Sequence, residues 1–177
     1  MIYFTGDTHF GHHNILHLCG RPFECVEDMN EFLIAKWNER VRNNDTIFIL
    51  GDMFFCCGEV ECILSRLRGK KRLLIGNHDT WVKKVDCSRY FQSVDKLLET
   101  TDGKHALTLC HYPMFTWNHP RRSYMVHAHT HNDRSADYWP LMQARERVLN
   151  AGVDINGFAP VTFDEMLENN RRFKRAD

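Results

Sequence analysis

The chain has 177 residues, 43% of them hydrophobic, and its 23 Lys and Arg residues balance 23 Asp and Glu residues. This length predicts one compact domain that buries roughly 70% of the surface of its unfolded chain. The charge balance excludes a global electrostatic field that would favour nucleic acid or an anionic membrane as a partner. We therefore expect a single domain over residues 1–177 without an inserted cap domain.

The amino terminus has no basic segment, and its apolar run stops at Gly6 and Asp7. This is not the pattern of a signal peptide or a membrane anchor. The seven cysteines include no Cys-x-x-Cys pair, which indicates reduced thiols and a cytoplasmic protein. The unusual number is eleven histidines, of which six lie within or beside the motifs described below.

Five short apolar runs end abruptly in polar residues, and such runs are typical of buried strands. The runs are Ile2–Thr5, Thr46–Leu50, Arg72–Ile75, Leu107–Cys110 and Tyr124–Val126. They are followed by Gly6-Asp7, Gly51-Asp52, Gly76-Asn77-His78-Asp79, His111 and the segment His127–His131. Ligands of open α/β sheets bind outside the carboxyl ends of the strands. We therefore expect these polar side chains to meet at one rim, with Asp52 at its centre.

The remaining segments predict helices and a hairpin around these strands. Apolar spacing predicts helices over Val26–Val41 and Glu59–Leu67, and Thr162 with Glu165 forms a capping box that opens a final helix. The segments Val94–Thr100 and Lys104–Cys110 read as a hairpin, which argues for a second, partly antiparallel sheet. The closing Arg171–Arg175 reads as a solvated basic tail.

The polar residues at the strand ends form a metal-ligand pattern. Asp7 and His9 occupy alternate positions, as do His129 and His131, so in an extended segment each pair projects to one side. Any one of these residues alone is more often structural, but their joint occurrence favours a metal site. The candidate ligands are Asp7, His9, Asp52, Asn77, His111, His129 and His131. With one bridging carboxylate they supply four ligands to each of two metals, which leaves positions for water and substrate.

The order of these motifs resembles that of the calcineurin-like metallophosphoesterases, and it covers the chain from Asp7 to His131. The segments Asp7–Ile15, Arg21-Pro22-Phe23 and His111-Tyr112-Pro113 look like a small bacterial and phage branch of that family, described only as predicted phosphohydrolases. The resemblance implies an α/β fold, a four-layer α/β/β/α sandwich of two mixed sheets flanked by helices. Ala128 departs from the family pattern, which usually has Gly before the paired histidines.

The resemblance also implies a role for each candidate residue. It assigns Asp7, His9, Asp52 and His131 to one metal, and Asp52, Asn77, His111 and His129 to the other. Asp52 is then the bridge, and His78 is not a ligand but faces the substrate. From its position next to the ligand Asn77 we further expect His78 to act as a general acid. Asp79 either orients the His78 imidazole or caps a short helix.

Two divalent cations roughly 3.5 to 4 Å apart lower the pKa of a bridging water, and the resulting hydroxide attacks phosphorus in line. Oxygen and imidazole ligands without thiolate fit manganese, our preferred ion, and also Fe, Zn or Ni. The predicted function is hydrolysis of a phosphodiester or a small phosphomonoester. The alternative is a non-catalytic, metal-binding interaction module that keeps the fold. Because the chain has no aromatic-studded basic stripe, a nucleic-acid substrate has no support from the sequence.

Several other residues have both a functional and a structural interpretation. His12, Arg121 and Arg122 are candidates for contacting the substrate phosphate, although loop packing or a solvated loop explains them equally well. For His127 we favour packing or a hydrogen bond over a role as a ligand.

Overall fold

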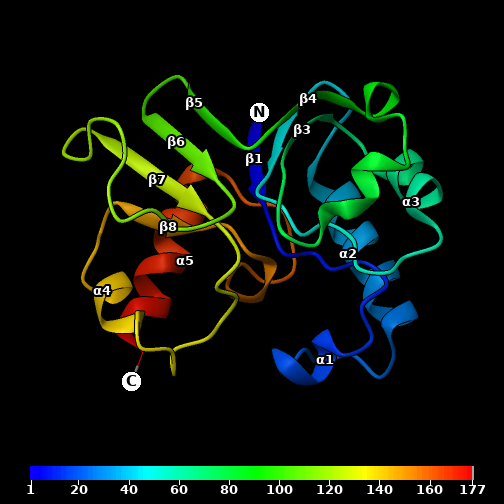
Figure 1. The fold of residues 1–177 in the computed structure, drawn as a ribbon, viewed down its shortest axis with the longest axis horizontal. Helices are drawn as coiled ribbons and strands as arrows, with labels where there is room; N and C mark the ends of the chain where they lie inside the picture. The colour runs from blue at the N-terminus through cyan, green and yellow to red at the C-terminus, as the bar shows by residue number, and fades with distance from the viewer. Residues whose placement is uncertain (177) are drawn as a thin grey trace.

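The computed structural model describes residues 1–176, which form two four-stranded sheets with flanking helices (Figure 1). The strands are β1 Ile2–Thr5, β2 Thr46–Ile49, β3 Lys70–Leu74, β4 Phe91–Asp95, β5 Leu97–Thr101, β6 Ala106–Cys110, β7 Ser123–His127 and β8 Val148–Asn150. The α-helices are α1 Ile15–Leu18, α2 Val26–Arg40, α3 Val60–Arg66, α4 Trp139–Gln143 and α5 Phe163–Arg175, and the 3-10 helices are η1 Asp79–Lys83, η2 Cys87–Arg89 and η3 Val153–Ile155.

The two sheets differ in strand direction. The first has the order β1-β2-β3-β4 and is parallel throughout, apart from an isolated antiparallel bridge between Phe4 and Val161. The second has the order β5-β6-β7-β8, in which β5 is antiparallel to β6 and the other pairs are parallel. The carboxyl ends of β1, β2 and β3 therefore share one edge of the first sheet, and those of β6 and β7 share one edge of the second.

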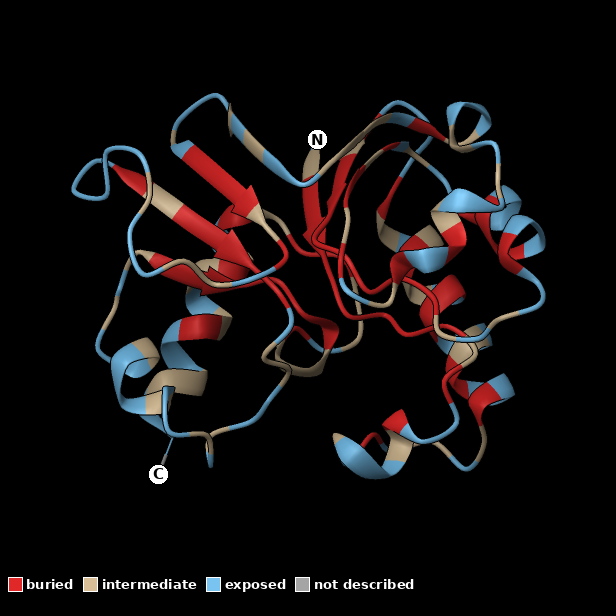
Figure 2. Ribbon diagram, in the orientation of Figure 1, coloured by how far each residue is buried: buried red, intermediate tan, exposed pale blue. Residues whose placement is uncertain are grey.

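Alternation along the first sheet divides its side chains between two cores. Tyr3 and Ile47 belong to the core that includes residues of α2 and α3, whereas Phe4 and Phe48 belong to the core that includes residues of β6, β7 and β8. Figure 1 places α2 and α3 on one side of the sheets and α4 and α5 on the other, and Figure 2 shows that most of the strand residues between them are buried. The arrangement is the predicted four-layer α/β/β/α sandwich.

The segment around Val94–Thr100 differs from the prediction of one strand. Phe91–Asp95 pairs in parallel with β3 of the first sheet, whereas Leu97–Thr101 pairs with β6 of the second. The chain changes sheets at Lys96, where the sequence has the charged pair Asp95-Lys96 but no Gly or Pro to mark a boundary. The predicted hairpin therefore consists of β5 and β6 only.

The predicted capping box is confirmed. The predicted solvated basic tail is correct only in part, because its arginines are exposed but the segment is helical and Lys174 is partly buried. The Thr162 side chain accepts a hydrogen bond from the Glu165 backbone, and α5 then runs through Arg175. The ammonium group of Lys174, near the end of this helix, donates to the backbone oxygens of Arg145 and Val148 at 2.6 Å each. None of the helices within residues 1–176 has the length and apolarity needed to cross a membrane.

Candidate metal centre

Every predicted ligand lies in a loop that follows a strand. Asp7 and His9 follow β1, Asp52 follows β2, Asn77 follows β3, His111 follows β6, and His129 and His131 follow β7. The loops after β1 and β2 continue the parallel pairing, because the Asp7 N–H donates to Gly51 O at 3.0 Å and the His9 N–H donates to Asp52 O at 3.1 Å. This backbone pairing keeps the two loops in register, and their side chains meet as expected for strand ends.

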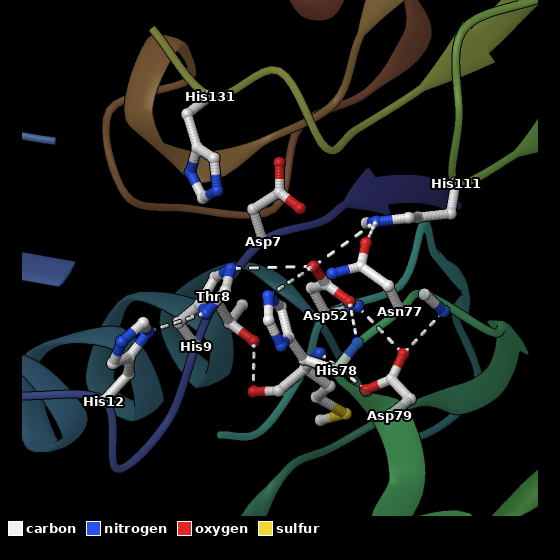
Figure 3. Close-up of polar contacts among 12 residues, drawn as sticks. Asp7, Thr8, His9, His12, Asp52, Asn77, His78, Asp79, His111 and His131 are labelled. Atoms are coloured by element: carbon white, nitrogen blue, oxygen red, sulfur yellow. Dashed lines mark hydrogen bonds and ion pairs between the residues drawn. The ribbon is translucent and has the colours of Figure 1, made fainter. Parts of the chain in front are cut away.

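Asp52 lies where the loops converge (Figure 3). Its Oδ2 atom is 3.3 Å from His111 Nε2, 3.8 Å from His9 Nε2 and 3.9 Å from His78 Nε2. His111 Nε2 is also 3.0 Å from Asn77 Oδ1. Burial opposes ionisation of Asp52, but the hydrogen bond and charge of His111, the His78 backbone N–H and the charge of His9 together outweigh it and lower the pKa of Asp52 to about 2. Asp52 is therefore an ionised carboxylate facing imidazoles from both sides.

The surrounding ligand atoms form two groups. Asp7, His9 and His131 make one group and Asp52, His111 and His129 the other, and within each group the atoms that could bind an ion lie within 4.8 Å of one another. His129 and His131 thus fall into different groups, although they are only two residues apart. Because Asp52 also approaches His9 of the first group, its carboxylate stands between the two.

Several atoms of the first group are buried without a hydrogen-bond partner among the described residues: both carboxylate oxygens of Asp7 and Nε2 of His9. Burial raises the pKa of Asp7 to about 6, and the nearby imidazoles of His131 and His111 offset this only in part. Burial also lowers the pKa of His9 to about 2, so this ring is neutral. Buried polar atoms are normally satisfied, and neutral imidazole and carboxylate are the forms that bind metals. The donor set therefore fits divalent cations.

The backbone at the centre differs from the extended geometry expected for Asp7 and His9. Both have φ of 51°, and Asp52, His129 and His131 have φ of 50°, 69° and 46°. These values lie in the left-handed region that residues other than glycine rarely adopt. The side chains converge through left-handed turns and not by strand alternation. Ala128 does not adopt a positive φ, so alanine is compatible with the backbone there.

Asp79 has neither of the two roles predicted for it. Its carboxylate accepts hydrogen bonds from the backbone N–H groups of Asp52, Met53 and Gly76 and from the Trp81 indole, all at 2.8 to 2.9 Å. It thereby ties the loop after β2 to the loop after β3. The two loops are so close that a Cβ atom on Gly76 would lie 2.2 Å from Asp52 Oδ1, which only glycine avoids.

His78 borders the centre and remains accessible, with 39% of its side chain exposed. Its backbone N–H donates to Asp52 Oδ1 at 2.8 Å, and its ring packs edge-on against Phe55 with centroids 4.9 Å apart. His12 is buried, stacks on Phe55, and places its Nδ1 atom 3.1 Å from Nδ1 of His9. This contact leaves His9 Nε2 directed at Asp52. The structure thus shows that His12 contacts the candidate metal ligand His9. Its contact with the substrate stays a prediction.

The structure does not bring Arg121 and Arg122 to the centre. Both are exposed and precede β7, whereas His129 and His131 follow it. A five-residue strand separates the two ends by roughly 16 Å. His127 is fully buried, and its Nδ1 atom lies 2.7 Å from Ala128 O. This geometry matches the interpretation of His127 as a packed, hydrogen-bonded residue.

Two residues that lie beside the centre were assigned no role from the sequence, although one of them, Arg21, belongs to a segment that carries the family resemblance. Asp154, from η3, lies 2.8 Å from His131 Nδ1, and Arg21, from the loop after α1, pairs with that carboxylate. Burial opposes protonation of His131, but its contacts with Asp154, Cys19 and Asp7 raise the pKa of its imidazole to about 11. The two residues of the pair are 133 positions apart, so no local pattern could connect them.

Comparison with known proteins places this geometry in a family. The model of the calcineurin-like phosphoesterase family matches residues 1–175. An uncharacterized protein of Methanocaldococcus jannaschii is 30% identical over 170 residues, which cover 94% of this chain and 89% of that protein. The Gene 66 protein of Mycobacterium phage L5 is 33% identical over 81 residues, or 44% of this chain and 39% of that protein. The crystal structure of a protein of unknown function from Aquifex aeolicus is similar with a TM-score of 0.71 and 26% identity, covering 95% of this chain and 98% of that one.

Proposed function

The chain belongs to the calcineurin-like phosphoesterase family, and from this membership we propose that it is a metal-dependent phosphoesterase that hydrolyses a phosphodiester or a small phosphomonoester. The observation that carries the proposal is the meeting of ligand groups from five loops around Asp52, with the buried Asp7 oxygens and His9 Nε2 lacking hydrogen-bond partners among residues 1–176. Burying a carboxylate without hydrogen-bond partners costs free energy in the metal-free protein, and bound cations compensate for that cost.

The proposed centre holds two divalent cations. Asp7, His9, Asp52 and His131 would hold one, and Asp52, Asn77, His111 and His129 the other. The position of Asp52 between the two groups of donors supports its role as the shared ligand. Because the donors are carboxylate, amide and imidazole, we propose manganese, with Fe, Zn or Ni as ions of the same chemical fit.

When bound, two such cations activate a water molecule near neutral pH and neutralise the charge of the phosphoryl oxygens. The residues of the chain supply orientation and proton transfer. We propose that His78, through its exposed imidazole, donates a proton to the leaving oxygen. Phe55, packed edge-on against the His78 ring, limits its rotation.

Two grooves adjoin the centre, each lined by at least one of its histidines. One of about 660 Å³ is lined by His129 and His131 together with Leu18 and Tyr138. The other, of about 630 Å³, is lined by His78 together with Cys57, Trp81 and Lys84 and others. If His78 is the proton donor, the leaving group occupies the second groove. We propose that these rim loops select the substrate in a single domain without a cap.

Two further proposals concern the setting of the reaction. All seven cysteines are free thiols, which supports a reducing, cytoplasmic location. The equal numbers of acidic and basic residues favour a small phosphoester over a long nucleic acid.

Hydrolysis assays with added Mn²⁺, Ni²⁺ or Zn²⁺ test the function. The substrates are p-nitrophenyl phosphate, its bis ester and the phenylphosphonate ester, and Asp52→Asn is the control. We expect metal-dependent release of p-nitrophenol that is lost in the control. If the protein binds two metals but hydrolyses none of these esters or other small phosphoesters, the non-catalytic interaction module is the correct reading.

A further inference from the structure

An ion pair is buried directly behind the ligand His131. Arg21 donates through Nε to Asp154 Oδ1 at 2.7 Å and through Nη2 to Asp154 Oδ2 at 3.0 Å. Both side chains are inaccessible, with exposed fractions of 0% and 1%. Asp154 Oδ2 is also 2.8 Å from His131 Nδ1, so this carboxylate fixes the imidazole and leaves Nε2 for a cation.

Arg21 reaches the other ligand loop through its remaining donors. Its Nη1 atom donates to the backbone oxygen of Thr8 at 2.9 Å, and its Nη2 atom donates to that of Asp7 at 2.7 Å. One guanidinium therefore holds the backbone around Asp7 and His9, and through Asp154 it holds His131. These three residues are the first group of ligand atoms.

The second half of the centre has a different support. Asp79 binds the backbone of Asp52, Met53 and Gly76, and His111 Nδ1 lies 2.7 Å from Leu50 O. Neither Arg21 nor Asp154 takes part in these hydrogen bonds. Asp52 is shared by both halves, and the backbone pairing of Asp7 and His9 with Gly51 and Asp52 also links them. The side-chain supports are otherwise separate: Arg21 and Asp154 serve one group of ligands, and Asp79 serves the other.

We propose that Arg21 and Asp154 are positioning residues that preform one half of the metal centre, so that this half gains or loses its cation independently of the half supported by Asp79. The proposal rests on the proposed metal centre and adds residues to which no role had been assigned. Removal of a group that orients a metal-bound histidine typically weakens metal binding about 10- to 100-fold.

A separate cation site at Cys19, His131 and Asp154 is the competing interpretation, because their ligand atoms also lie within 4.8 Å of one another. Both Asp154 oxygens already accept hydrogen bonds from the Arg21 guanidinium. A cation there would face this fixed positive charge at close range and would have to displace its hydrogen bonds. The contacts therefore favour support of His131 over a third ion.

The test is titration of the metal-free protein with Mn²⁺ by calorimetry, with electron paramagnetic resonance to distinguish single from paired ions. In Asp154→Asn, an amide NH₂ replaces one of two oxygens that serve three donors, so at least one donor loses its acceptor. We expect one Mn²⁺ site to weaken about 10- to 100-fold while the other changes less than about twofold. At intermediate Mn²⁺ the spectrum should then be that of single ions, where the wild type gives the paired signal.

Two further variants assign the sites and control for stability. Asn77→Ala should weaken the other site, and the double variant should weaken both. Glu165→Gln breaks another ion pair between distant segments, with Arg40 at 2.6 Å, and should leave both Mn²⁺ affinities unchanged. If Asp154→Asn does not fold by circular dichroism, Arg21→Lys keeps the charge but loses the two-pronged geometry, and it should weaken the same site.

The outcomes separate this proposal from the proposed function. If the wild type binds two Mn²⁺ ions and Asp154→Asn, or Arg21→Lys in its place, leaves both affinities unchanged or lowers both equally, the positioning role is wrong and the metal centre stands. The role is also wrong if Asp154→Asn and Asn77→Ala weaken the same site. If the wild type binds no divalent cation, the proposed function itself fails.

Discussion

Asp79→Asn should be among the most destabilising conservative changes in the chain. Each Asp79 oxygen accepts two hydrogen bonds: Oδ1 from Met53 N and Trp81 Nε1, and Oδ2 from Asp52 N and Gly76 N. Whichever way the Asn amide is turned, its NH₂ group faces two buried donors. A buried donor without an acceptor costs about 1 to 3 kcal/mol, so the expected loss is about 4 kcal/mol. In a domain of this size that lowers the melting temperature by about 8 to 16 °C.

Urea and thermal unfolding of the metal-free protein measure this loss directly. The matched control is Asp86→Asn, because Asp86 also accepts bonds, from Ser88, but lies on the surface where water can replace them. We expect the control to change the free energy of unfolding by less than about 0.5 kcal/mol. A loss for Asp79→Asn no larger than that of the control would refute the idea that this carboxylate holds the two loops together.

Three further outcomes are expected. Asp52→Asn should lower Mn²⁺ occupancy and activity far more than His127→Gln, because Asp52 is proposed to contact both ions; equal losses would contradict the shared role. His78→Ala should keep both metals but lower the hydrolysis rate of alkyl esters by a factor of about 10² to 10⁴. The rate on p-nitrophenyl esters should fall much less, since a good leaving group needs little protonation. Loss of metal, or equal losses of rate on both ester types, would exclude the acid role. Burial lowers the pKa of Lys174 to about 8 from its ordinary 10.5, so between these values the unfolded chain keeps a proton that the folded chain has lost. The free energy of unfolding of the wild type should therefore rise with pH over this window, relative to Lys174→Met, by at most about 1.4 kcal/mol per pH unit; a flat difference would show that the amine titrates normally.

The strand ends could be predicted because each is a local event in the sequence. An apolar run that stops at Gly-Asp, Gly-Asn-His-Asp or His marks both the end of a buried strand and the polar group that follows it. Parallel pairing then brings these ends to one edge, which is how Asp7, Asp52 and Asn77 come together. The change of sheets at Lys96 could not be predicted in this way, because both flanking segments have strand-like composition and only their partners differ.

The supports of the ligands escaped prediction for a different reason. Asp79 could be seen beside Asn77 and His78, but its role depends on the backbone of Asp52, which is distant in sequence and near only after folding. Asp154 lies in a segment with no recognisable motif, and its partners are His131 and Arg21. Such residues act through tertiary contacts, so a pattern of ligands identifies a centre without identifying what holds it.

The backbone of the centre explains why these supports are needed. Asp7, His9, Asp52, His129 and His131 all have positive φ. The left-handed region costs a residue other than glycine about 1 to 2 kcal/mol, so the five together cost roughly 5 to 10 kcal/mol, comparable with the whole stability of a typical domain. Strain of this size persists only where the surroundings fix the conformation.

The fixed surroundings are the hydrogen bonds that the supports make to these same loops. Asp79 binds the N–H of Asp52, and Arg21 binds the backbone oxygens of Asp7 and Thr8, which lie between the two positive-φ residues Asp7 and His9. A chain that kept every ligand but lost Asp79 and Arg21 would relieve the strain by returning the loops to ordinary backbone geometry, and its ligands would separate. The proposed binding of two cations would therefore depend on buried polar residues that are not themselves among the proposed metal ligands.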